Sequence, residues 1–514
     1  MTPFDPAPPG SACAPAGAFP HPLESDPIGI ASILATTRRV HFIGIGGSGM
    51  SGLARVLKRR GFQVSGSDGK ASPTTAQLER EGVRITIGHD PSAIDFGDGF
   101  VVLSAAVPAE NPEVAAAAAR RLPMAKYAAA LGGAVATRRV VAIAGCHGKT
   151  TTTALTTFLL RRAGIDCGFV IGGRVPQLDG SAGEGRAREF VVEACEFDRS
   201  FLHFSAAAAA ITNLDADHLD YYGTFDAVAD AFAQFVLRMR SEGMLVTTPE
   251  AWKVLAPRLE ATPDWAAKRV RVRTVGIGAA ADDRIVPVRV DPDRNDGTRS
   301  AMRIVAGHHD LGLFHLRLAG SHNLSNAAMA VLLALEMGAD LEAVRRALAD
   351  FHGVDRRLTV HHASPDLTVV DDYGHHPAEI RATLAAAREQ FLASSGDDGR
   401  DASRRLVLVF QPHQYSRTRL LFADFVEALQ GADRVILPEI YAARDNDEDR
   451  KAVSSAHLAE ALRAKGVDAE FAPTLDVAAE LAWTGRRPGD VILTSGAGDV
   501  DRVADELVRR ASAR

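Results

Sequence analysis

The chain has 514 residues, of which 46% are hydrophobic and 24% are charged, a composition typical of ordinary globular proteins. Its formal net charge of −6 leaves no basic excess for binding nucleic acid or an anionic membrane surface. No apolar run reaches the ~18 residues that a membrane-spanning helix needs, so we expect a cytoplasmic protein without membrane insertion.

At about 150 residues per domain, the length predicts three domains. The four cysteines (Cys13, Cys146, Cys167 and Cys195) show no paired spacing, so neither a disulfide framework nor a zinc site is predicted. Residues 1–37 are rich in Pro, Ala and Gly and lack both an apolar core segment and early positive charge. We expect a disordered leader of undefined role. No sequence feature decides the oligomeric state.

A glycine-rich turn follows the first predicted strand, residues 39–44. The turn, Gly44-Ile45-Gly46-Gly47-Ser48-Gly49, leads into a helical pattern, and a second strand then ends at Ser67-Asp68. This order matches the dinucleotide fingerprint G-x-G-x-x-G with an acidic residue about 20 positions later. The glycines require only that a diphosphate can approach the backbone. NAD, FAD, a UDP-sugar and a turn without ligand therefore all stay open for a Rossmann-like domain over residues 38–136.

A second glycine-rich loop, Gly145-Cys146-His147-Gly148-Lys149-Thr150-Thr151, joins the apolar run 140–144 to a helical pattern. Backbone N–H groups and a helix N-terminus would face an anion there, the lysine would add a mobile positive charge, and a threonine hydroxyl could ligate Mg²⁺. The usual pattern G-x-x-x-x-G-K-[ST] needs glycine at Ile143, so this loop is a shortened form. It predicts nucleotide-phosphate binding by a mostly parallel, P-loop ATPase-like sheet over residues 137–352.

Two later strands of this central domain end in polar side chains. The run 189–193 ends on Glu193, and the run 206–213 is followed by a segment that contains His218. Side chains just past strand ends build the sites of α/β folds. Beside a phosphate loop they are interpreted as Mg²⁺ ligands, although each alone is equally well explained as a solvated loop residue.

Residues 270–318 have the pattern of short strands with turns, which predicts an antiparallel flap on the main sheet. Gly320 then opens a helix that carries Asn323 and Asn326 on its first turn. Residues three apart lie one above the other, so these amides could bind a base or ribose. Simple N-capping is the alternative, and it explains one asparagine more naturally than two.

Residues 353–514 predict a third domain, a Rossmann-like, doubly wound parallel sheet. The strand 367–372 runs into Tyr373-Gly374-His375-His376-Pro377, with the proline suited to the first position of a helix. The strand 405–410 is likewise followed by a polar segment that contains Arg417. Further strands are expected at 434–437 and 490–494. The two polar strand ends favour a ligand-facing surface over a purely structural histidine pair.

Together these motifs resemble the Mur ligase family of peptidoglycan synthesis. The resemblance begins at residue 39, runs in family order to the last helix, and leaves out only the leader. The matching stretches, weak or moderate alone but specific together, are 41–52, 145–153, 193–202, 212–218, 320–326, 355–357, 371–377, 410–418 and 496–499.

The resemblance implies a three-domain α/β ligase that closes around its substrates and attaches L-alanine to the carboxylate of UDP-N-acetylmuramate with ATP, through an acyl phosphate. Glycine or L-serine stay open as amino acids, because one methyl group is worth only ~1–3 kcal/mol. The diphosphate of the UDP-sugar would lie on the Gly44–Gly49 turn, with Ser67, Asp68 and Ser104 nearby. The resemblance therefore favours a UDP-sugar over NAD, because the same backbone geometry can bind the diphosphate of either ligand.

The resemblance also assigns roles in the other two domains. ATP would lie on Gly145–Thr151 with Lys149 against its phosphates, Thr150 and Glu193 would hold one Mg²⁺, and His218 a second. Asn323, Asn326, Arg357 and Asp372 would contact the nucleotide, with Arg356 as the runner-up to Arg357. Tyr373, His375 and Arg417 would face the amino acid and the muramoyl carboxylate. Catalysis would depend on Lys149, Glu193, His218, Arg357 and His375.

The chain departs from the family pattern at three places. Cys146 stands where threonine is usual, which should matter little apart from thiol sensitivity, and Gln414 stands where arginine is usual. The loss of that cation would leave Arg417, with Arg419 as a second candidate, to hold the carboxylates. The Glu193–Ser200 segment also differs from the commoner acidic version, and we take Glu193 over Glu196 as the metal ligand because Glu193 falls at the strand end.

Three alternatives stay open. Within the family, the nearest is the recycling ligase that attaches a whole tripeptide, which typically has a first turn less dense in glycine. Outside it, the chain could be an NAD-dependent oxidoreductase with an extra nucleotide domain. A non-catalytic, nucleotide-gated binding protein is the third.

Overall fold

The computed structural model describes residues 27–278, 280–290, 296–392, 404–443 and 445–513. The chain separates into two compact units, residues 1–138 with 182–184 and the remainder, so each is described by itself. Within the described residues, no helix combines the length and the apolar character needed to cross a bilayer.

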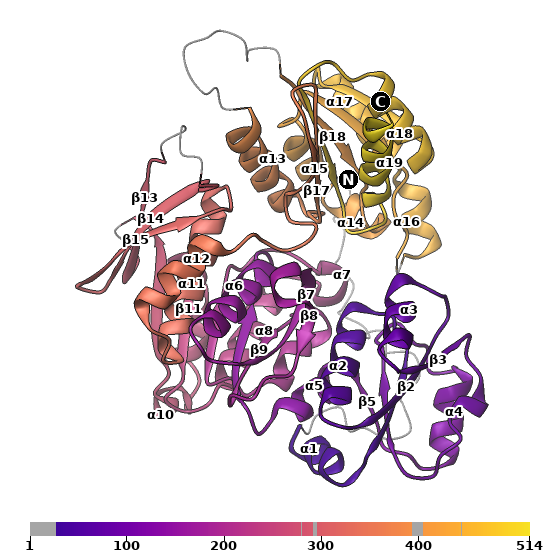
Figure 1. The fold of residues 1–514 in the computed structure, drawn as a ribbon, viewed down its shortest axis with the longest axis vertical. Coiled ribbons are helices and arrows are strands. Elements are labelled where there is room, and N and C mark those ends of the chain that lie inside the picture. The colour runs from indigo at the N-terminus through magenta and orange to yellow at the C-terminus, as the bar shows by residue number, and fades with distance from the viewer. Residues whose placement is uncertain (1–26, 279, 291–295, 393–403, 444, 514) are drawn as a thin grey trace, which may run out of the picture. The chain divides into compact units, whose positions relative to one another are not determined.

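The first unit, whose strands β2, β3 and β5 are labelled in Figure 1, contains a five-stranded parallel sheet with the order β3-β2-β1-β4-β5. Four of the five residues of β1 are buried, as expected for a strand covered on both faces. The strands are β1 (Arg39–Ile43), β2 (Gln63–Asp68), β3 (Arg84–Ile87), β4 (Phe100–Leu103) and β5 (Met124–Lys126). The helices are α1 (Pro27–Thr36), α2 (Ser48–Arg59), α3 (Pro73–Arg80), α4 (Pro112–Ala119) and α5 (Tyr127–Val135), with a 3₁₀ turn at Pro91–Ala93.

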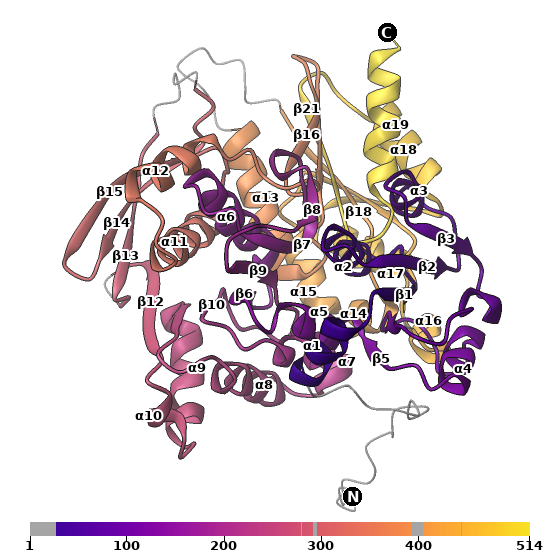
Figure 2. The ribbon, with the colours of Figure 1, turned by 60° about the horizontal axis from the view of Figure 1, so that its bottom comes forward.

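Helix α1 corrects the predicted leader boundary, because residues 27–36 are helical and not disordered. Ile30 and Leu34, one turn apart, are buried, while Ile28 is 75% exposed. The helix packs on α5, where a Cβ added to Gly133 would lie 2.3 Å from Ile30 Cγ2 (Figures 1 and 2). The composition of the segment did not indicate this interface, half of which is formed by α5. Residues 1–26 of the predicted leader lie outside the described residues.

The central sheet has ten strands in the order β15-β14-β13-β12-β11-β10-β6-β9-β7-β8. The strands are β6 (Arg139–Ala144), β7 (Gly168–Val175), β8 (Gly180–Gly183), β9 (Glu189–Glu193), β10 (Ala208–Ile211), β11 (Met244–Thr247), β12 (Arg271–Ile277), β13 (Asp283–Val288), β14 (Ser300–Ala306) and β15 (His309–Leu316). The helices are α6 (Lys149–Arg162), α7 (Leu219–Tyr222), α8 (Phe225–Leu237), α9 (Pro249–Glu260), α10 (Trp265–Lys268), α11 (Ser321–Glu336) and α12 (Leu341–Asp350), with 3₁₀ turns at Pro176–Leu178 and Phe197–His203.

The predicted antiparallel flap is part of this sheet. Strands β13, β14 and β15 pair antiparallel, whereas β12 pairs parallel with both β11 and β13. Helices α6 and α11, which both carry predicted site residues, lie side by side over one core (Figures 1 and 2).

The last sheet has the order β16-β17-β21-β18-β19-β20. All its pairs are parallel except β16 with β17, which agrees with the predicted doubly wound domain. The strands are β16 (Thr359–Ala363), β17 (Leu367–Asp372), β18 (Leu406–Phe410), β19 (Arg434–Pro438), β20 (Asp468–Ala472) and β21 (Asp490–Ser495). The helices are α13 (Pro377–Phe391), α14 (Tyr415–Leu420), α15 (Phe422–Leu429), α16 (Asp447–Ala452), α17 (Ser455–Ala464), α18 (Leu475–Thr484) and α19 (Asp501–Ser512). Pro377 opens α13 as predicted.

Replacing Ile30 by alanine should lower the free energy of unfolding of the first unit by about 2–5 kcal/mol, the usual cost of truncating a fully buried aliphatic side chain. Ile28→Ala on the same helix is the matched control and should change it by less than about 0.5 kcal/mol. Calorimetric unfolding measures both. Equal effects would contradict the packing of α1 on α5.

Candidate active site

The phosphate loop leaves β6 at Ala144 and enters α6 at Lys149. Gly145 and Gly148 have φ angles of +130° and +80°, which favour glycine. A Cβ at Gly145 would lie 2.0 Å from Thr212 Oγ1, and one at Gly148 would lie 2.6 Å from Asn326 Oδ1. Both positions therefore require glycine for two reasons, backbone conformation and space.

Residues after β10 hold the loop in shape. Asn213 Oδ1 accepts a hydrogen bond from the backbone N of His147 (2.9 Å), and Thr212 Oγ1 and Asn213 Nδ2 both donate to its carbonyl oxygen (2.5 and 3.1 Å). Cys146 Sγ accepts from the backbone N of Asp215 (3.2 Å) and donates to its carbonyl. Burial, together with nearby Glu196, raises the thiol pKa of Cys146. Cys146 therefore links the phosphate loop to the segment after β10, and as a neutral thiol it is a poor nucleophile.

Lys149 folds back onto its own loop. Its Nζ donates to the carbonyls of Gly145 and Cys146 (2.6 and 3.0 Å) and to Glu196 Oε1 (2.9 Å). Burial disfavours the ammonium, but the adjacent Glu196 carboxylate outweighs this and raises the lysine pKa. Lys149 therefore stays cationic beside the loop.

Thr150 Oγ1 donates to Glu193 Oε1 at 3.0 Å. Glu193 is the last residue of β9, and its other oxygen accepts from the backbone N of Gly172 at 2.6 Å. A hydroxyl and a carboxylate in contact at the start of the loop helix are oxygen donors of the kind Mg²⁺ prefers.

His218 lies in a different cluster from Glu193. One donor atom each from Glu196, Asp217 and His218 lies within 4.8 Å of the others, and His218 Nε2 is 3.7 Å from Glu196 Oε1. Burial lowers the pKa of His218, so the imidazole is neutral and able to ligate a metal. Asp217 also pairs with Arg417 Nη2 of the last domain at 3.4 Å.

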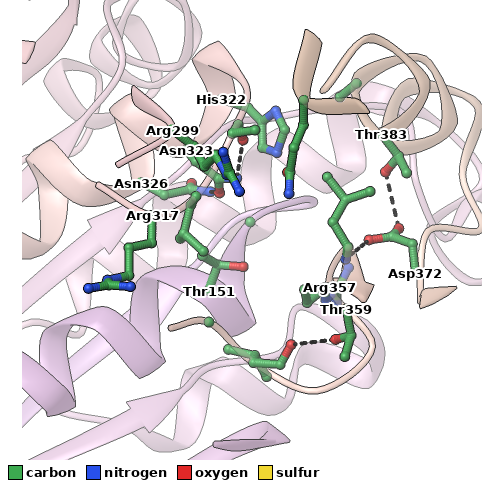
Figure 3. Close-up of a pocket in the computed structure, with 18 of the residues that line it drawn as sticks. Thr151, Arg299, Arg317, His322, Asn323, Asn326, Arg357, Thr359, Asp372 and Thr383 are labelled. Atoms are coloured by element: carbon green, nitrogen blue, oxygen red, sulfur yellow. Dashed lines mark hydrogen bonds between the residues drawn. The ribbon is translucent and has the colours of Figure 1, made fainter. Parts of the chain in front are cut away.

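A cavity of about 680 Å³ opens beside the loop (Figure 3), a volume typical of small-molecule sites. Both the central and the last domain contribute to its wall. The predicted nucleotide residues that line it are His147, Gly148, Thr151, Asn323, Asn326, Arg357 and Asp372. The remaining ones, Gly145, Cys146, Lys149 and Thr150, form the loop and the start of α6 behind it.

The two asparagines do not cap α11, whose N-cap is Gly320 and carries no side-chain cap bond. Asn323 Nδ2 donates to the carbonyl of Ala319 (2.7 Å), and Asn326 Nδ2 donates to Asn323 Oδ1 (3.2 Å). Both are buried at the cavity wall (Figure 3). This arrangement favours the ligand interpretation over N-capping.

The adjacent arginines, Arg356 and Arg357, make different contacts. Arg356 Nε donates to the fully buried Asp371 (2.9 Å), and its other nitrogens donate to the carbonyls of Gly496 and Gly498. Arg357 lines the cavity and places its guanidinium 5.2 Å from the Tyr373 ring centre. Arg356 therefore ties strand ends together, and Arg357 is the cation that faces a ligand. Asp372 accepts from Leu358 N and Thr383 Oγ1 and so supports this turn (Figure 3).

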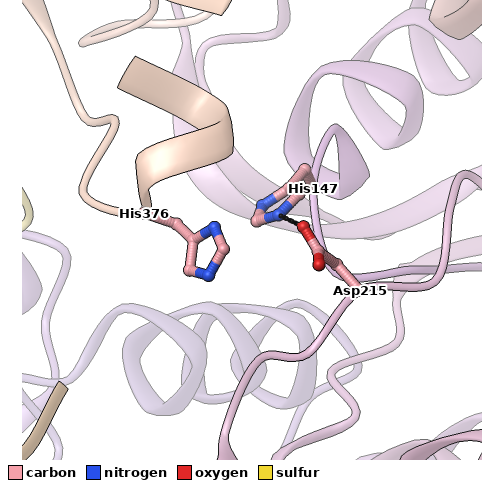
Figure 4. A group of neighbouring side chains, drawn as sticks. All are labelled: His147, Asp215 and His376. Atoms are coloured by element: carbon pink, nitrogen blue, oxygen red, sulfur yellow. Dashed lines mark hydrogen bonds and ion pairs between the residues drawn. The ribbon is translucent and has the colours of Figure 1, made fainter. Parts of the chain in front are cut away.

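His147 joins the phosphate loop to the last domain. Its Nε2 is 3.2 Å from Asp215 Oδ2, and its ring lies tilted against that of His376 (Figure 4). Its Nδ1 is 3.3 Å from Glu379 Oε1. Burial opposes the charge, but Asp215 and Glu379 raise the pKa of His147 to about 9. The donor atoms of His147, Asp215 and His376 lie within 4.8 Å of one another. At neutral pH the protonated ring pairs with both carboxylates, and a metal could bind here only by displacing its proton.

His375 and Tyr373 follow β17. His375 Nδ1 is 3.2 Å from the carbonyl of Tyr373, and its ring packs edge-on to Tyr373 and His413. Burial lowers the pKa of His375 to about 3, so the side chain is neutral. Neither residue lines the large cavity. Arg417 lines a small separate hollow with Asp217 and His218.

Of the two arginines expected to replace the cation missing at Gln414, only Arg417 is in a position to do so. Gln414 is buried as the N-cap of α14 with a φ angle of +74°. Arg419 Nε donates to Asp449 Oδ1 at 2.7 Å, so the second candidate cation is committed to α16. Arg417 is left as the buried cation of this turn.

In the first unit, the glycine-rich turn borders a cavity of about 550 Å³. Four predicted residues line it, namely Gly44, Gly47, Asp68 and Ser104. Asp68 Oδ2 accepts from the backbone N of Gly46 (2.8 Å), and a Cβ at Gly49 would lie 2.6 Å from the Tyr127 ring. Ser48 and Gly49 begin α2, whose first N–H groups lack intrahelical partners.

Two other predicted residues of this turn face the interior. Ile45 and Ser67 are fully buried, and Ser67 Oγ donates to the buried Glu113 at 2.6 Å. Their side chains therefore support the turn from the protein interior and do not line the cavity.

Four charged side chains of the site have no predicted role: Asp215, Asp217 and Glu379, which were assigned none, and Glu196, which was set aside in favour of Glu193 as the metal ligand. Glu196, Asp215 and Asp217 stand within or beside the quoted stretches, and Glu379 occupies the third position of the helix that Pro377 opens. An acidic residue in the first turn after an N1 proline is a helix-start signal that would have indicated Glu379. The others needed the three-dimensional arrangement.

Three family models match the chain. They are described as Mur ligase family, catalytic domain (residues 39–139), Mur ligase middle domain (143–334) and Mur ligase, glutamate ligase domain (356–498). Proteins named UDP-N-acetylmuramate–L-alanine ligase from Anaeromyxobacter sp. (strain Fw109-5) and Myxococcus xanthus (strain DK1622) are 42% and 39% identical. Each alignment covers 91% of this chain, and 97% and 94% of the relative.

Among solved structures, the UDP-N-acetylmuramate–alanine ligase of Thermotoga maritima superposes with a TM-score of 0.74 at 26% identity, over 92% of this chain and 99% of that one. A murein peptide ligase from Psychrobacter arcticus shares the fold, with a TM-score of 0.64 at 23% identity over 92% and 98%.

Arg356→Ala should destabilise the second unit by about 3–5 kcal/mol, because it leaves Asp371 buried and unpaired. Arg357→Ala removes no ion pair within the described residues and should shift stability by less than about 1 kcal/mol. Denaturant unfolding followed by circular dichroism compares the two. The reverse order would contradict the division of tasks between them.

Proposed function

The chain belongs to the Mur ligase family, and we propose that it joins L-alanine to the carboxylate of UDP-N-acetylmuramate while ATP becomes ADP and phosphate. The observation that carries the proposal is the phosphate loop at the mouth of a two-domain cavity, with Lys149 cationic and carboxylates in contact behind it. The relatives named above carry this activity in their names.

ATP would lie with its phosphates on Gly145–Thr151 and its nucleoside in the cavity. The loop provides N–H groups at a helix start, where an anion is favoured. Asn323, Asn326 and Arg357 reach the same space from α11 and from the turn before β16. The amides supply both donors and acceptors for a base or ribose, and Arg357 supplies a cation.

The first step activates a carboxylate, which is a poor acyl donor in water. An oxygen of the muramoyl carboxylate attacks the γ-phosphorus, the bond to the bridging oxygen breaks, and ADP leaves with that electron pair. Such steps depend on positioning and charge stabilisation. Lys149 and Arg357 provide fixed positive charge.

The donor set supports a magnesium-dependent reaction. Thr150 and Glu193 would hold one ion through oxygen atoms, and His218 would hold a second beside Glu196 and Asp217. When bound, Mg²⁺ would neutralise charge on the phosphate oxygens.

The second step forms the amide. The amine nitrogen of L-alanine attacks the acyl carbon, the carbon–oxygen bond to phosphate breaks, and inorganic phosphate leaves. His375 is neutral at physiological pH, and it would accept the proton that the amine nitrogen loses as the amide forms. Arg417 supplies a buried cation that suits a carboxylate, and Tyr373 stands beside Arg357.

UDP-N-acetylmuramate would bind the first unit, with its diphosphate at the start of α2. Gly44 and Gly47 allow close approach, and Asp68 and Ser104 border the same cavity. Nucleotide substrates of this kind favour a cytoplasmic reaction that supplies cell-wall precursors for growth and division.

The direct test is phosphate release from ATP in the purified protein. Release should require UDP-N-acetylmuramate and L-alanine together, because the acyl phosphate forms on the sugar and is consumed by the amine. Omitting either substrate, or replacing L-alanine by the tripeptide that the recycling ligase uses, is the control. Nicotinamide reduction on mixing with NAD, or release with neither substrate, would overturn the proposal.

Lys149→Ala should lower turnover by at least ~10²-fold, the usual cost of removing a group that stabilises developing charge. Binding of UDP-N-acetylmuramate, measured by calorimetry, should stay nearly unchanged because its proposed site is in the other unit. Loss of sugar binding would contradict this division.

Glu193→Gln should raise the Mg²⁺ concentration for half-maximal activity by about 10- to 100-fold, since a neutral amide is a weaker ligand than a carboxylate. The amide can still pair with Thr150. An unchanged magnesium dependence would assign the ion elsewhere.

A further inference from the structure

Glu379 is a largely buried carboxylate that the proposed chemistry does not use. Its side chain is 13% exposed. Oε2 accepts hydrogen bonds from the backbone N–H groups of His375 (3.0 Å) and His376 (3.2 Å), the reciprocal half of a capping box at the start of α13. Oε1 lies 3.3 Å from His147 Nδ1 in the phosphate loop. One carboxylate therefore contacts both domains of the site.

The histidine that Glu379 contacts is held on both sides. His147 Nε2 lies 3.2 Å from Asp215 Oδ2, on the segment after β10. Each ring nitrogen faces a carboxylate oxygen, and these two carboxylates raise the pKa of His147, so the ring is an imidazolium at neutral pH. The titratable groups facing the ring are Asp215 and Asp217 from the central domain, and His376 and Glu379 from the last domain.

The same contacts reach the segment that carries His375. The loop bears the phosphates of ATP in the proposed reaction, and His375 is held by Glu379 through its backbone N–H. A shift of α13 relative to the loop would separate the activated carboxylate from the group proposed to receive the amine proton. Misplacement by about 1 Å can cost about 10²-fold in rate.

We propose that Glu379 is a positioning residue for ligation: with His147 and Asp215 it forms a carboxylate–imidazolium–carboxylate bridge that keeps the phosphate loop and His375 in one arrangement. This inference rests on the proposed function. Glu379 would affect the rate through its contacts with His147 and His375, without touching the reacting atoms.

The variant Glu379→Gln distinguishes the bridging role of Glu379 from its role in capping α13. The amide oxygen of glutamine still accepts the N–H bonds of a capping box, but the negative charge opposite His147 is lost. We expect kcat to fall by about 10-fold or more, while the affinity for ADP changes less than about threefold. The thermal midpoint at neutral pH should fall, because the carboxylate no longer helps to hold the His147 pKa high. Glu389→Gln, an exposed residue of the same helix, is the matched control and should leave all three values unchanged.

A second readout needs no catalysis. In ligand-free protein with ¹³C-labelled histidine, the ring of His147 should titrate near pH 9 and move toward its ordinary value of 6.5 in Glu379→Gln. His147→Gln assigns the resonance. In a double-mutant cycle, His147→Gln combined with Glu379→Gln should lose no more activity than the worse single variant.

Two outcomes would overturn the bridge: an unchanged titration of His147 in Glu379→Gln, or additive losses in the cycle. A wild-type protein that failed to ligate L-alanine would refute the proposed function instead. The histidine titration and ADP calorimetry would still decide the bridge in that case.

Discussion

The phosphate loop depends on the register of the strands around it. Ala144 of β6 is paired with Ile211 of β10, and Ile143 is paired with Glu193 of β9. The residues that follow these parallel strands therefore meet at one sheet edge. Thr212 and Asn213 reach the backbone of His147 from one side, and Glu193 reaches Thr150 from the other. A slip of one residue in either pairing would turn these side chains away from the loop.

This dependence explains what the sequence predicts and what it leaves out. The position of Glu193 at a strand end beside the loop made it a Mg²⁺ candidate, and the family resemblance assigned it to the same ion as Thr150. The contact of Lys149 with Glu196 was not expected, because Glu196 lies beyond β9 as the N-cap of a 3₁₀ turn with left-handed backbone at Asp198 and Arg199. Asp217 and Arg417 are 200 residues apart, and only domain packing brings them together. Helix α1 was missed for a similar reason, since α5 completes its apolar face.

Most buried charges of the second unit are balanced by a neighbour. Asp371 is paired with Arg356, Asp217 with Arg417, and His147 with two carboxylates. Burying an unpaired charge is costly, so these pairs fix the positions of the elements that carry them. Arg357 differs, because it makes no ion pair within the described part of the chain and faces the cavity. A cation held ready in this way needs little rearrangement when an anion arrives.

The contact between Lys149 and Glu196 has a consequence for how the reaction ends. An anion on the loop must compete with Glu196 for the ammonium group. A whole nucleotide can do so, since contacts to its base and ribose contribute binding energy remote from the phosphates. Inorganic phosphate has no such second attachment, so in the proposed reaction Glu196 would regain the lysine once the acyl group is gone. The Lys149–Glu196 contact would then favour phosphate release and make phosphate a weak inhibitor.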